Sequence, residues 1–271
     1  MNAENFRNEF LAYFEKFRKT LSTKTGEWVV KGFIDVYKNI YTISIDTKVI
    51  SKIIELMLFP VISRFAAEHK LKMVLCEFQN HYPDITFIAP DGTKIALDLK
   101  STYTIDHETV NGFTLGAFTG YFRDRQSTKN ITFPYQEYTA HFVFGIIYSR
   151  NETAIDERRI YKLDDLLDIV SVAQNFQFLL QEKWRIASDQ PGSGNTKNIG
   201  SVKKIKDLMK GKGVFAEFGV EVFDDYWMNY LTDDMARAIE SKVPYRNLQE
   251  YFKWRKRISI KSPNPRLPSR S

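Results

Sequence analysis

Apolar residues in the first quarter of the chain recur at helical or extended spacing. Four phenylalanines lie three or four residues apart between positions 4 and 19, which predicts an amphipathic helix. Residues 27–45 are rich in β-branched and aromatic side chains, which favours a hairpin. Asp46 and Thr47 are suitable N-caps for a helix from about residue 48 to 69. Pro60 should bend or break that helix.

The pattern of apolar and polar residues also predicts strands and a helix in the second half of the chain. Residues 131–149 end in a strand with few polar positions, residues 163–172 look helical, and residues 176–186 look like a strand that leads into a loop. We find no internal repeat and no low-complexity linker. Residues 1–271 are therefore expected to form a single domain.

A short hairpin is predicted where two apolar runs flank a turn. Residues 85–88 and 94–100 are the runs, and Ala89-Pro90-Asp91-Gly92 between them has turn chemistry. If the turn is centred near Asp91, the register places Asp84 opposite Asp98, with Cβ atoms roughly 5 Å apart. The hairpin therefore brings two carboxylates together.

The alternation of side chains along the second run assigns its two faces. Ala96, Asp98 and Lys100 share one face, and the leucine and isoleucine side chains between them point to the core. Like charges opposite each other destabilise a hairpin, and a hard divalent cation with oxygen ligands compensates for them. The Pro-Asp, Asp-x-Lys arrangement therefore predicts a metal-dependent nuclease site.

Two simpler interpretations compete with this one. Asp84 could merely begin a strand, with Asp98 and Lys100 forming a local ion pair on a solvated face. Glu55 follows two isoleucines of the predicted 48–69 helix, near the rim of its apolar stripe. It is either an exposed helix acid or a third acidic group near the metal site.

Composition narrows the class of protein. The chain has a net charge of +6 and a pI near 9.1, a mild excess that permits polyanion binding without proving it. Cys76 is the single cysteine, so no disulfide framework exists, and a buried, inert thiol in a reducing cytoplasm is expected. Neither a signal peptide nor a membrane-spanning run is found.

A glycine-rich loop is the second informative segment. Gly192, Gly194 and Gly200 permit close backbone approach, and the polar residues between them supply hydrogen-bond donors and acceptors. The order of a phosphate-binding P-loop is absent. Asparagine amides suit base edges in the major groove of DNA. The alternative is a flexible surface connection.

The chain resembles the EcoRV-like Type II restriction endonucleases of the PD-(D/E)xK nuclease superfamily. The resemblance runs in the same order along residues 45–230. Its motifs are Asp46-Thr-Lys-Val49 with Glu55-Leu56, Gln79-Asn-His-Tyr-Pro-Asp84, Asp98-Leu-Lys100, Phe113-Thr-Leu-Gly116, Thr128-Lys-Asn-Ile131, Leu180-Gln-Glu-Lys-Trp184 and Gly192-Ser-Gly-Asn-Thr-Lys-Asn-Ile-Gly-Ser201.

This resemblance implies an α/β fold with a mixed central β-sheet flanked by helices. It also implies a symmetric homodimer on double-stranded DNA, because a two-fold protein presents identical loops to the two halves of a palindrome. Residues 20–45 would be a dimerisation subdomain, residues 188–201 a base-recognition loop, and residues 259–271 a basic, disordered tail. A cognate DNA methyltransferase would protect the host.

The resemblance further assigns roles in catalysis. Asp84 and Asp98 would ligate Mg²⁺ beside the carbonyl of Leu99, with Mn²⁺ as a substitute. Glu55 would be an accessory acid for a second or alternative ion. Lys100 would orient or help deprotonate the attacking water and stabilise charge on the phosphate.

Recognition residues carry over by motif as well. Major-groove contacts would come from Gly192, Ser193, Gly194, Asn195, Thr196 and Asn198, and minor-groove contacts from Gln79 and Asn80. Phosphate or sugar contacts would come from Thr47, Lys48, Ser101, Thr102, Thr114, Thr119 and Lys129. A GATATC-like site with a blunt cut is expected.

Some positions depart from the family pattern. Phe78 replaces a glutamine, and Met228 and Thr232 stand where arginines are expected. Arg255 to Arg257 could replace the missing charge. The alternatives are a related nuclease of other specificity or with a repair role, and a noncatalytic DNA-binding module, although Lys100 beside both aspartates argues against the module.

Overall fold

A mixed five-stranded sheet forms the centre of the molecule. The structure, a computed structural model, describes residues 1–78, 80–151, 156–192 and 197–261. The strand order is β3-β4-β5-β7-β9. Only β5 and β7 pair in parallel, and the other neighbours are antiparallel. The strands span Lys72–Leu75 (β3), Ile85–Ile88 (β4), Lys94–Tyr103 (β5), Tyr138–Arg150 (β7) and Ala173–Glu182 (β9). The expected mixed sheet is confirmed.

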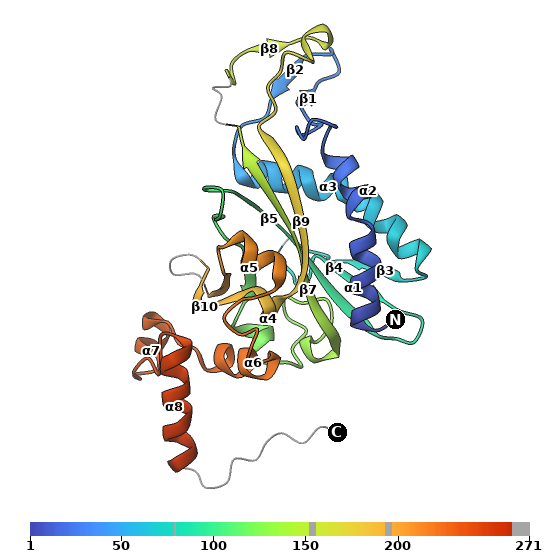
Figure 1. Cartoon of the computed structure of the whole chain (residues 1–271). Coiled ribbons are helices and arrows are strands. Elements are labelled where there is room, and N and C mark those ends of the chain that lie inside the picture. Colours follow the sequence, from blue (N-terminus) through green and yellow to red (C-terminus); the bar gives the residue numbers. More distant parts are fainter. Residues whose placement is uncertain (79, 152–155, 193–196, 262–271) are drawn as a thin grey trace.

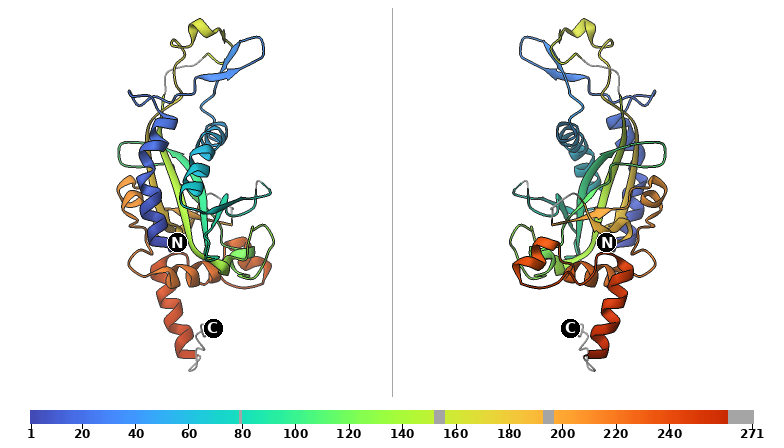
Figure 2. Two further views of the ribbon diagram at one scale, coloured as in Figure 1. Left: turned by 90° about the vertical axis from the view of Figure 1, so that its right-hand side faces the viewer. Right: turned by 90° about the vertical axis from the view of Figure 1, so that its left-hand side faces the viewer.

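Helices α1 (Ala3–Ala12), α2 (Phe14–Leu21) and α3 (Thr47–Glu68) pack against one face of this sheet (Figures 1 and 2). The expected single helix over residues 4–19 is interrupted at Tyr13, which ends α1. Phe10 and Phe17 nevertheless stay on one core, with ring centroids 5.2 Å apart. The amphipathic pattern is thus right, and the continuity was wrong.

Pro60 lies inside α3 without ending it. Asp46 caps the helix, because its side chain accepts hydrogen bonds from the backbone N–H groups of Lys48 and Val49. Ile54, Leu58 and Ile62 are buried on both sides of the proline. A proline removes one hydrogen bond from a helix interior, and burial of this apolar stripe offsets the loss. The predicted break therefore does not occur.

The other face of the sheet carries a second apolar core that includes Ala96, Val143 and Ile147. This core contains residues from α4 to α8 and from the loops between β6 and β7. These helices span Lys183–Ile186 (α4), Ile205–Lys210 (α5), Val220–Asn229 (α6), Asp233–Ala238 (α7) and Leu248–Lys261 (α8). The central sheet is therefore covered on both faces, by the first core on one side and the second core on the other.

The segment 163–172 is not the expected helix. Only Leu163–Asp165 form a 3-10 turn, in which the Asp165 carboxylate accepts a hydrogen bond from the backbone N–H of Lys162. Ile169 instead packs beside Ile40 and Tyr161 in a small satellite core. Long-range packing therefore overrides the local pattern here. The predicted strand over 176–186 is β9, which ends at Glu182 and is followed by α4.

Two small antiparallel sheets flank the centre. One has the order β10-β11-β6, with β10 at Ala187–Pro191, β11 at Asn198–Ser201 and β6 at Thr114–Ala117. The other has the order β1-β2-β8, with β1 at Gly32–Ile34, β2 at Ile40–Thr42 and β8 at Ile160–Tyr161. Figure 2 shows that this second sheet and α8 lie at opposite ends of the molecule.

Residues 259–261, expected at the start of a disordered tail, belong instead to α8, which runs through Lys261. Residues 262–271 lie outside the described residues. In the described part of the chain, no helix is long and apolar enough to cross a membrane.

Candidate active site

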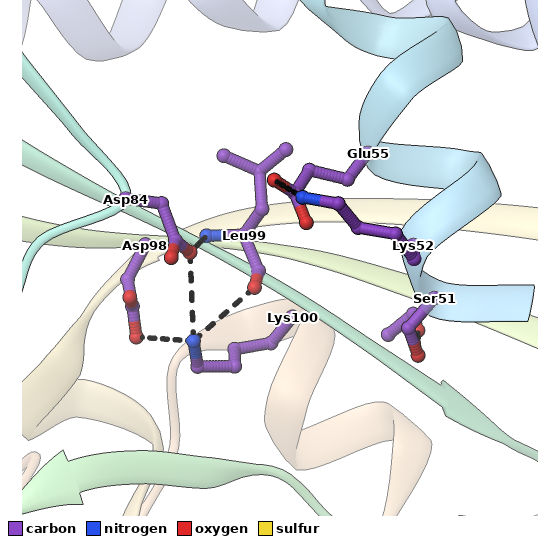
Figure 3. A network of polar contacts seen from close by, with 8 residues as sticks. Ser51, Lys52, Glu55, Asp84, Asp98, Leu99 and Lys100 are labelled. Carbon is purple, nitrogen blue, oxygen red and sulfur yellow. Dashed lines mark hydrogen bonds and ion pairs between the residues drawn. The ribbon is translucent and has the colours of Figure 1, made fainter. Parts of the chain in front are cut away.

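The predicted hairpin positions the two carboxylates. In β4 and β5, Ile85 pairs with Leu97 and Ile88 pairs with Lys94, as expected from the turn. Asp84 directly precedes β4, so the same register places it opposite Asp98. Figure 3 shows both carboxylates on the same side of β5, facing Lys100.

Lys100 and the backbone of Leu99 hold this pair together. The Lys100 ammonium nitrogen lies 2.8 Å from Asp98 Oδ2 and 3.5 Å from Asp84 Oδ2. It also donates to the carbonyl oxygen of Leu99 at 3.2 Å, and the Leu99 N–H donates to Asp84 Oδ2 at 2.7 Å (Figure 3). Consecutive residues of one strand thus fix both carboxylates without a contribution from another chain.

The site is partly desolvated, so the ion pair of Asp98 and Lys100 does not lie on a fully solvated face. The Asp98 side chain is 5% exposed, and the side chains of Asp84 and Lys100 are 26% and 27% exposed. Burial and then the charge of Asp98 raise the pKa of Asp84 to about 7. Burial opposes the charge of Lys100, but the two aspartates raise the pKa of this lysine above its usual value. Lys100 therefore stays protonated at neutral pH.

These residues have the chemistry of a divalent cation site. Asp98 Oδ2 is buried, and among the described residues it has the ion-pair contact with Lys100 but no hydrogen bond of good geometry. Burial is the larger cause of the raised pKa of Asp84 and the charge of Asp98 the second, so a cation bound beside both carboxylates would favour their ionised forms. Oxygen ligands of this kind suit Mg²⁺ or Mn²⁺. Within the described ranges, however, no three acidic, histidine or cysteine side chains converge as a ready metal cluster.

Glu55 lies beside the hairpin rather than within the carboxylate pair. It projects from α3, is 28% exposed and forms an ion pair of 2.8 Å with Lys52. It lines a cavity of about 50 Å³ together with Leu99 and Lys100. Burial and then Asp84 and Glu55 raise the pKa of the half-buried Cys76 thiol, so both acids act on one neighbourhood. Glu55 is thus close to the two aspartates but makes its ion pair with Lys52 and not with Lys100.

A polar cleft adjoins Glu55 on the side of α3. Its volume is about 340 Å³, and Ser51, Lys52 and Asn111 contribute to its walls. Four of the residues that sequence motifs assign to phosphate or sugar contacts also line it, namely Thr47, Lys48, Ser101 and Thr102. Hydroxyl and ammonium groups of this kind suit phosphate oxygens. Glu55 and Ser101 line both this cleft and the small cavity beside Leu99 and Lys100.

The other recognition candidates lie apart from that cleft. Gly192 and Asn198 lie on either side of the segment that joins β10 to β11, and the Gly192 N–H donates to the Asn198 carbonyl at 2.9 Å. Thr114 is exposed on β6, opposite Gly200 of β11. Asn80 and Lys129 are exposed, and Thr119 precedes the 3-10 turn Gly120–Phe122. Gln79, Ser193, Gly194, Asn195 and Thr196 lie outside the described residues.

Sequence patterns missed one charged residue near the site. Lys183 is 1% exposed, and its ammonium nitrogen lies 4.1 Å from the centre of the Tyr82 ring. Tyr82 stacks on Tyr121, and its hydroxyl is 2.9 Å from Nδ1 of His141. The available signal was a lysine that directly follows the run Phe-Leu-Leu-Gln-Glu at the end of β9.

Comparison with known proteins adds independent information. The model of the family "Restriction endonuclease EcoRV" matches residues 24–256 of this chain. The Type II restriction enzyme EcoRV of Escherichia coli is 39% identical over 237 residues, which are 86% of this chain and 94% of that enzyme. The solved structure of NlaIV restriction endonuclease aligns with 94% of this chain and 96% of its own, with 10% identity and a TM-score of 0.38.

Proposed function

The chain belongs to the family of the restriction endonuclease EcoRV and is a Type II site-specific deoxyribonuclease, and we propose that it uses Mg²⁺ to cut a GATATC-like palindrome. The observation that carries this proposal is the contact of Lys100 with both Asp84 and Asp98 across one hairpin. A module that only binds DNA has no need for two desolvated carboxylates that share a lysine. The substrate is double-stranded DNA.

Asp84, Asp98 and the Leu99 carbonyl would hold the metal, with Glu55 as an accessory acid. When bound, Mg²⁺ lowers the pKa of a water molecule and neutralises phosphate charge. Lys100 stays charged at neutral pH, which favours a role in stabilising negative charge on the phosphate over a role as general base. Water attacks phosphorus in line and gives a proton to bulk solvent, the bond from phosphorus to the 3′ oxygen breaks, and that oxygen takes up a proton from solvent. The products carry a 5′-phosphate and a 3′-hydroxyl.

The polar cleft supports the proposed backbone contacts. Thr47, Lys48 and Ser101 reach it from α3 and β5, the elements that also carry Glu55 and Asp98. A phosphate bound there would therefore be fixed relative to the carboxylate pair. Base recognition would come from the turn between β10 and β11 in the major groove and from residues 79–80 in the minor groove, with a blunt central cut.

We further propose that the chain acts as a homodimer through the β1-β2-β8 sheet. Several large apolar side chains are exposed there, which in a monomer is unusual. Val36 is 90% exposed and Leu167 is 91% exposed, and the patch also includes Phe33, Ile34, Tyr37, Tyr41, Ile160, Leu163 and Leu166. A second copy would cover this surface and supply the second active site that a double-strand cut requires. In the cell, a cognate methyltransferase would protect host DNA.

Plasmid cleavage tests the proposal directly. The purified protein is incubated with a sequenced plasmid and Mg²⁺, and the new termini are mapped, with Asp98→Ala in parallel. We expect discrete blunt ends within GATATC that the substitution abolishes. Cuts at another sequence would refute the proposed specificity and retain the chemistry, whereas DNA binding without cleavage in wild type would refute the catalytic role.

A further inference from the structure

Lys183 is a buried cation whose nitrogen atom has no polar partner among the described residues. This nitrogen atom donates no hydrogen bond to any of them. The ion pairs within the described ranges do not include it either. An unpaired charge in a protein interior is costly unless its surroundings compensate. The position of this ammonium group therefore requires a physical explanation.

Aromatic ring faces, and not carboxylates, are the groups that lie against the Lys183 ammonium group. The nitrogen lies 4.1 Å from the centre of the Tyr82 ring and 5.6 Å from that of Tyr135. Tyr121 stacks on Tyr82 with ring centroids 5.3 Å apart. Aromatic faces attract cations, more strongly where water is excluded. Tyr82 stands two residues before Asp84, so the ring beneath the cation belongs to the segment that sets one catalytic carboxylate.

The charge of Lys183 also acts on the other carboxylate. Burial lowers the pKa of Lys183 to about 8, and among nearby charges Asp98 opposes this most strongly. Lys100 and Arg125 add to the lowering. Asp98 is therefore its main electrostatic partner, although the two groups form no ion pair. Lys183 and Lys100 thus both act on Asp98.

The β10-β11-β6 sheet, which we propose reads the bases, lies close to the same ammonium group at Gly116 of β6. A Cβ atom at Gly116 would lie 3.6 Å from the Lys183 nitrogen and 3.3 Å from the Tyr121 hydroxyl. The φ angle of Gly116 is +87°, which residues other than glycine rarely adopt. The neighbouring Ala117 pairs with Asn198 of β11, next to the base-recognition turn. Any shift of β6 therefore changes the packing of Lys183.

We propose that Lys183 is a positioning residue that links base recognition by the β10-β11-β6 sheet to the placement of Asp84 and Asp98. Its ammonium group lies beside Gly116 of β6 and over the ring of Tyr82, which precedes Asp84, and it interacts electrostatically with Asp98. Correct base pairs would seat β6 so that the buried charge holds the carboxylates in their cutting arrangement. This inference rests on the proposed function, and it assigns part of the sequence specificity to the cleavage step.

Two substitutions separate charge from packing. Lys183→Met keeps the length of the side chain and removes its charge, whereas Lys183→Ala also leaves a cavity. Cleavage is measured on a duplex carrying the mapped site and on a duplex with one base pair of that site changed. For Lys183→Met we expect kcat on the correct site to fall about 5- to 150-fold, with KM within about twofold of wild type. Its melting temperature should equal or exceed that of wild type, because the unpaired amine is removed.

The ratio of kcat/KM values between the two duplexes is the decisive measurement. We expect Lys183→Met to lower this ratio by the same factor as kcat on the correct site. The rate on the altered site should not change, because its base pairs do not position the carboxylates through Lys183 even in wild type. A wild-type ratio and kcat in Lys183→Met, with loss only in Lys183→Ala, would show that Lys183 merely fills space and would overturn the inference. If wild type cleaves neither duplex, the proposed function itself fails.

Discussion

The backbone N–H of Leu99 donates a 2.7 Å hydrogen bond to Oδ2 of Asp84, across the two strands of the hairpin. The carbonyl of the same residue accepts a hydrogen bond from Lys100. One peptide segment therefore orients a carboxylate and an ammonium group together. Because these interactions come from β4 and β5 alone, the arrangement does not depend on DNA or on a partner subunit.

Removal of the Lys100 charge should impair both cleavage and the stability of the metal-free protein. For Lys100→Met we expect a loss in cleavage rate of roughly 100- to 1,000-fold, since a group that stabilises transition-state charge is removed. The unfolding free energy should fall by about 1–3 kcal/mol, less than for a fully buried pair because Lys100 is partly exposed. Lys94→Met is a matched control on β5, where the lysine pairs with Glu137 at 2.9 Å. Equal effects of both substitutions would contradict the assignment.

The pKa of Asp84 predicts a pH dependence of stability in the absence of metal. The folded state keeps the Asp84 proton to about pH 7, whereas an unfolded aspartate loses it near its ordinary value of 3.8. Between these values the folded state binds more protons, so the unfolding free energy should fall as pH rises, by at most ~1.4 kcal/mol per pH unit. Chemical denaturation of wild type and Asp84→Asn from about pH 4 to 8 measures this, and the substitution should remove the fall.

Asp91 on the same hairpin provides a control of opposite sign. Hydrogen bonds from Thr93 lower the pKa of this exposed carboxyl to about 2. Its contribution to stability is present above the ordinary pKa and disappears as pH falls toward about 2. Asp91→Asn should therefore leave the change between about pH 4 and 7 intact. If it removed that change as well, Asp84 would not be its source.

Disruption of the exposed apolar patch should dissociate the proposed dimer. Val36→Asp and Leu167→Asp place a charge where a partner subunit would bury a hydrophobic side chain. Sedimentation should show dimers for wild type and monomers for both variants at micromolar concentration, and plasmid cleavage should shift from linear to nicked products. Ile239→Asp, at a position 62% exposed after α7, is the control that should stay dimeric. Monomeric wild type would refute the proposed interface.

The basic face of α8 should bind phosphates outside the cleft. Arg255 is engaged with Asp225 at 2.9 Å, whereas Lys253, Lys256 and Arg257 are exposed and form no ion pair with any residue that the structure describes. Neutralising these three residues should weaken DNA binding and lower the slope of log K against log salt by roughly 0.9 for each phosphate that is no longer neutralised. Titrations at several salt concentrations measure the slope. An unchanged slope would show that α8 does not touch DNA.

The sequence predicted the register of the hairpin better than the structure around it. The register of the 84–100 hairpin followed from turn residues and alternation, because both are local properties. The predictions of a continuous helix over 4–19 and of a helix over 163–172 were wrong. Tyr13 and Ile169 pack against residues that are distant in sequence, and local periodicity does not report such contacts. The role of Lys183 was invisible for the same reason: its neighbours Tyr82 and Gly116 lie far away in sequence and meet it only in the folded chain.

Lys100 lies where a metal ion would bind, because its ammonium group contacts both Asp84 and Asp98. Its ammonium group is a monovalent counter-ion attached to the chain, and a divalent cation bound at this site would compete with it for the same carboxylate oxygens. In the absence of metal, Lys100 therefore offsets part of the repulsion between the two aspartates. Metal binding would free the Lys100 ammonium group from the two carboxylates, so the group that neutralises them in the metal-free protein would become available to the phosphate.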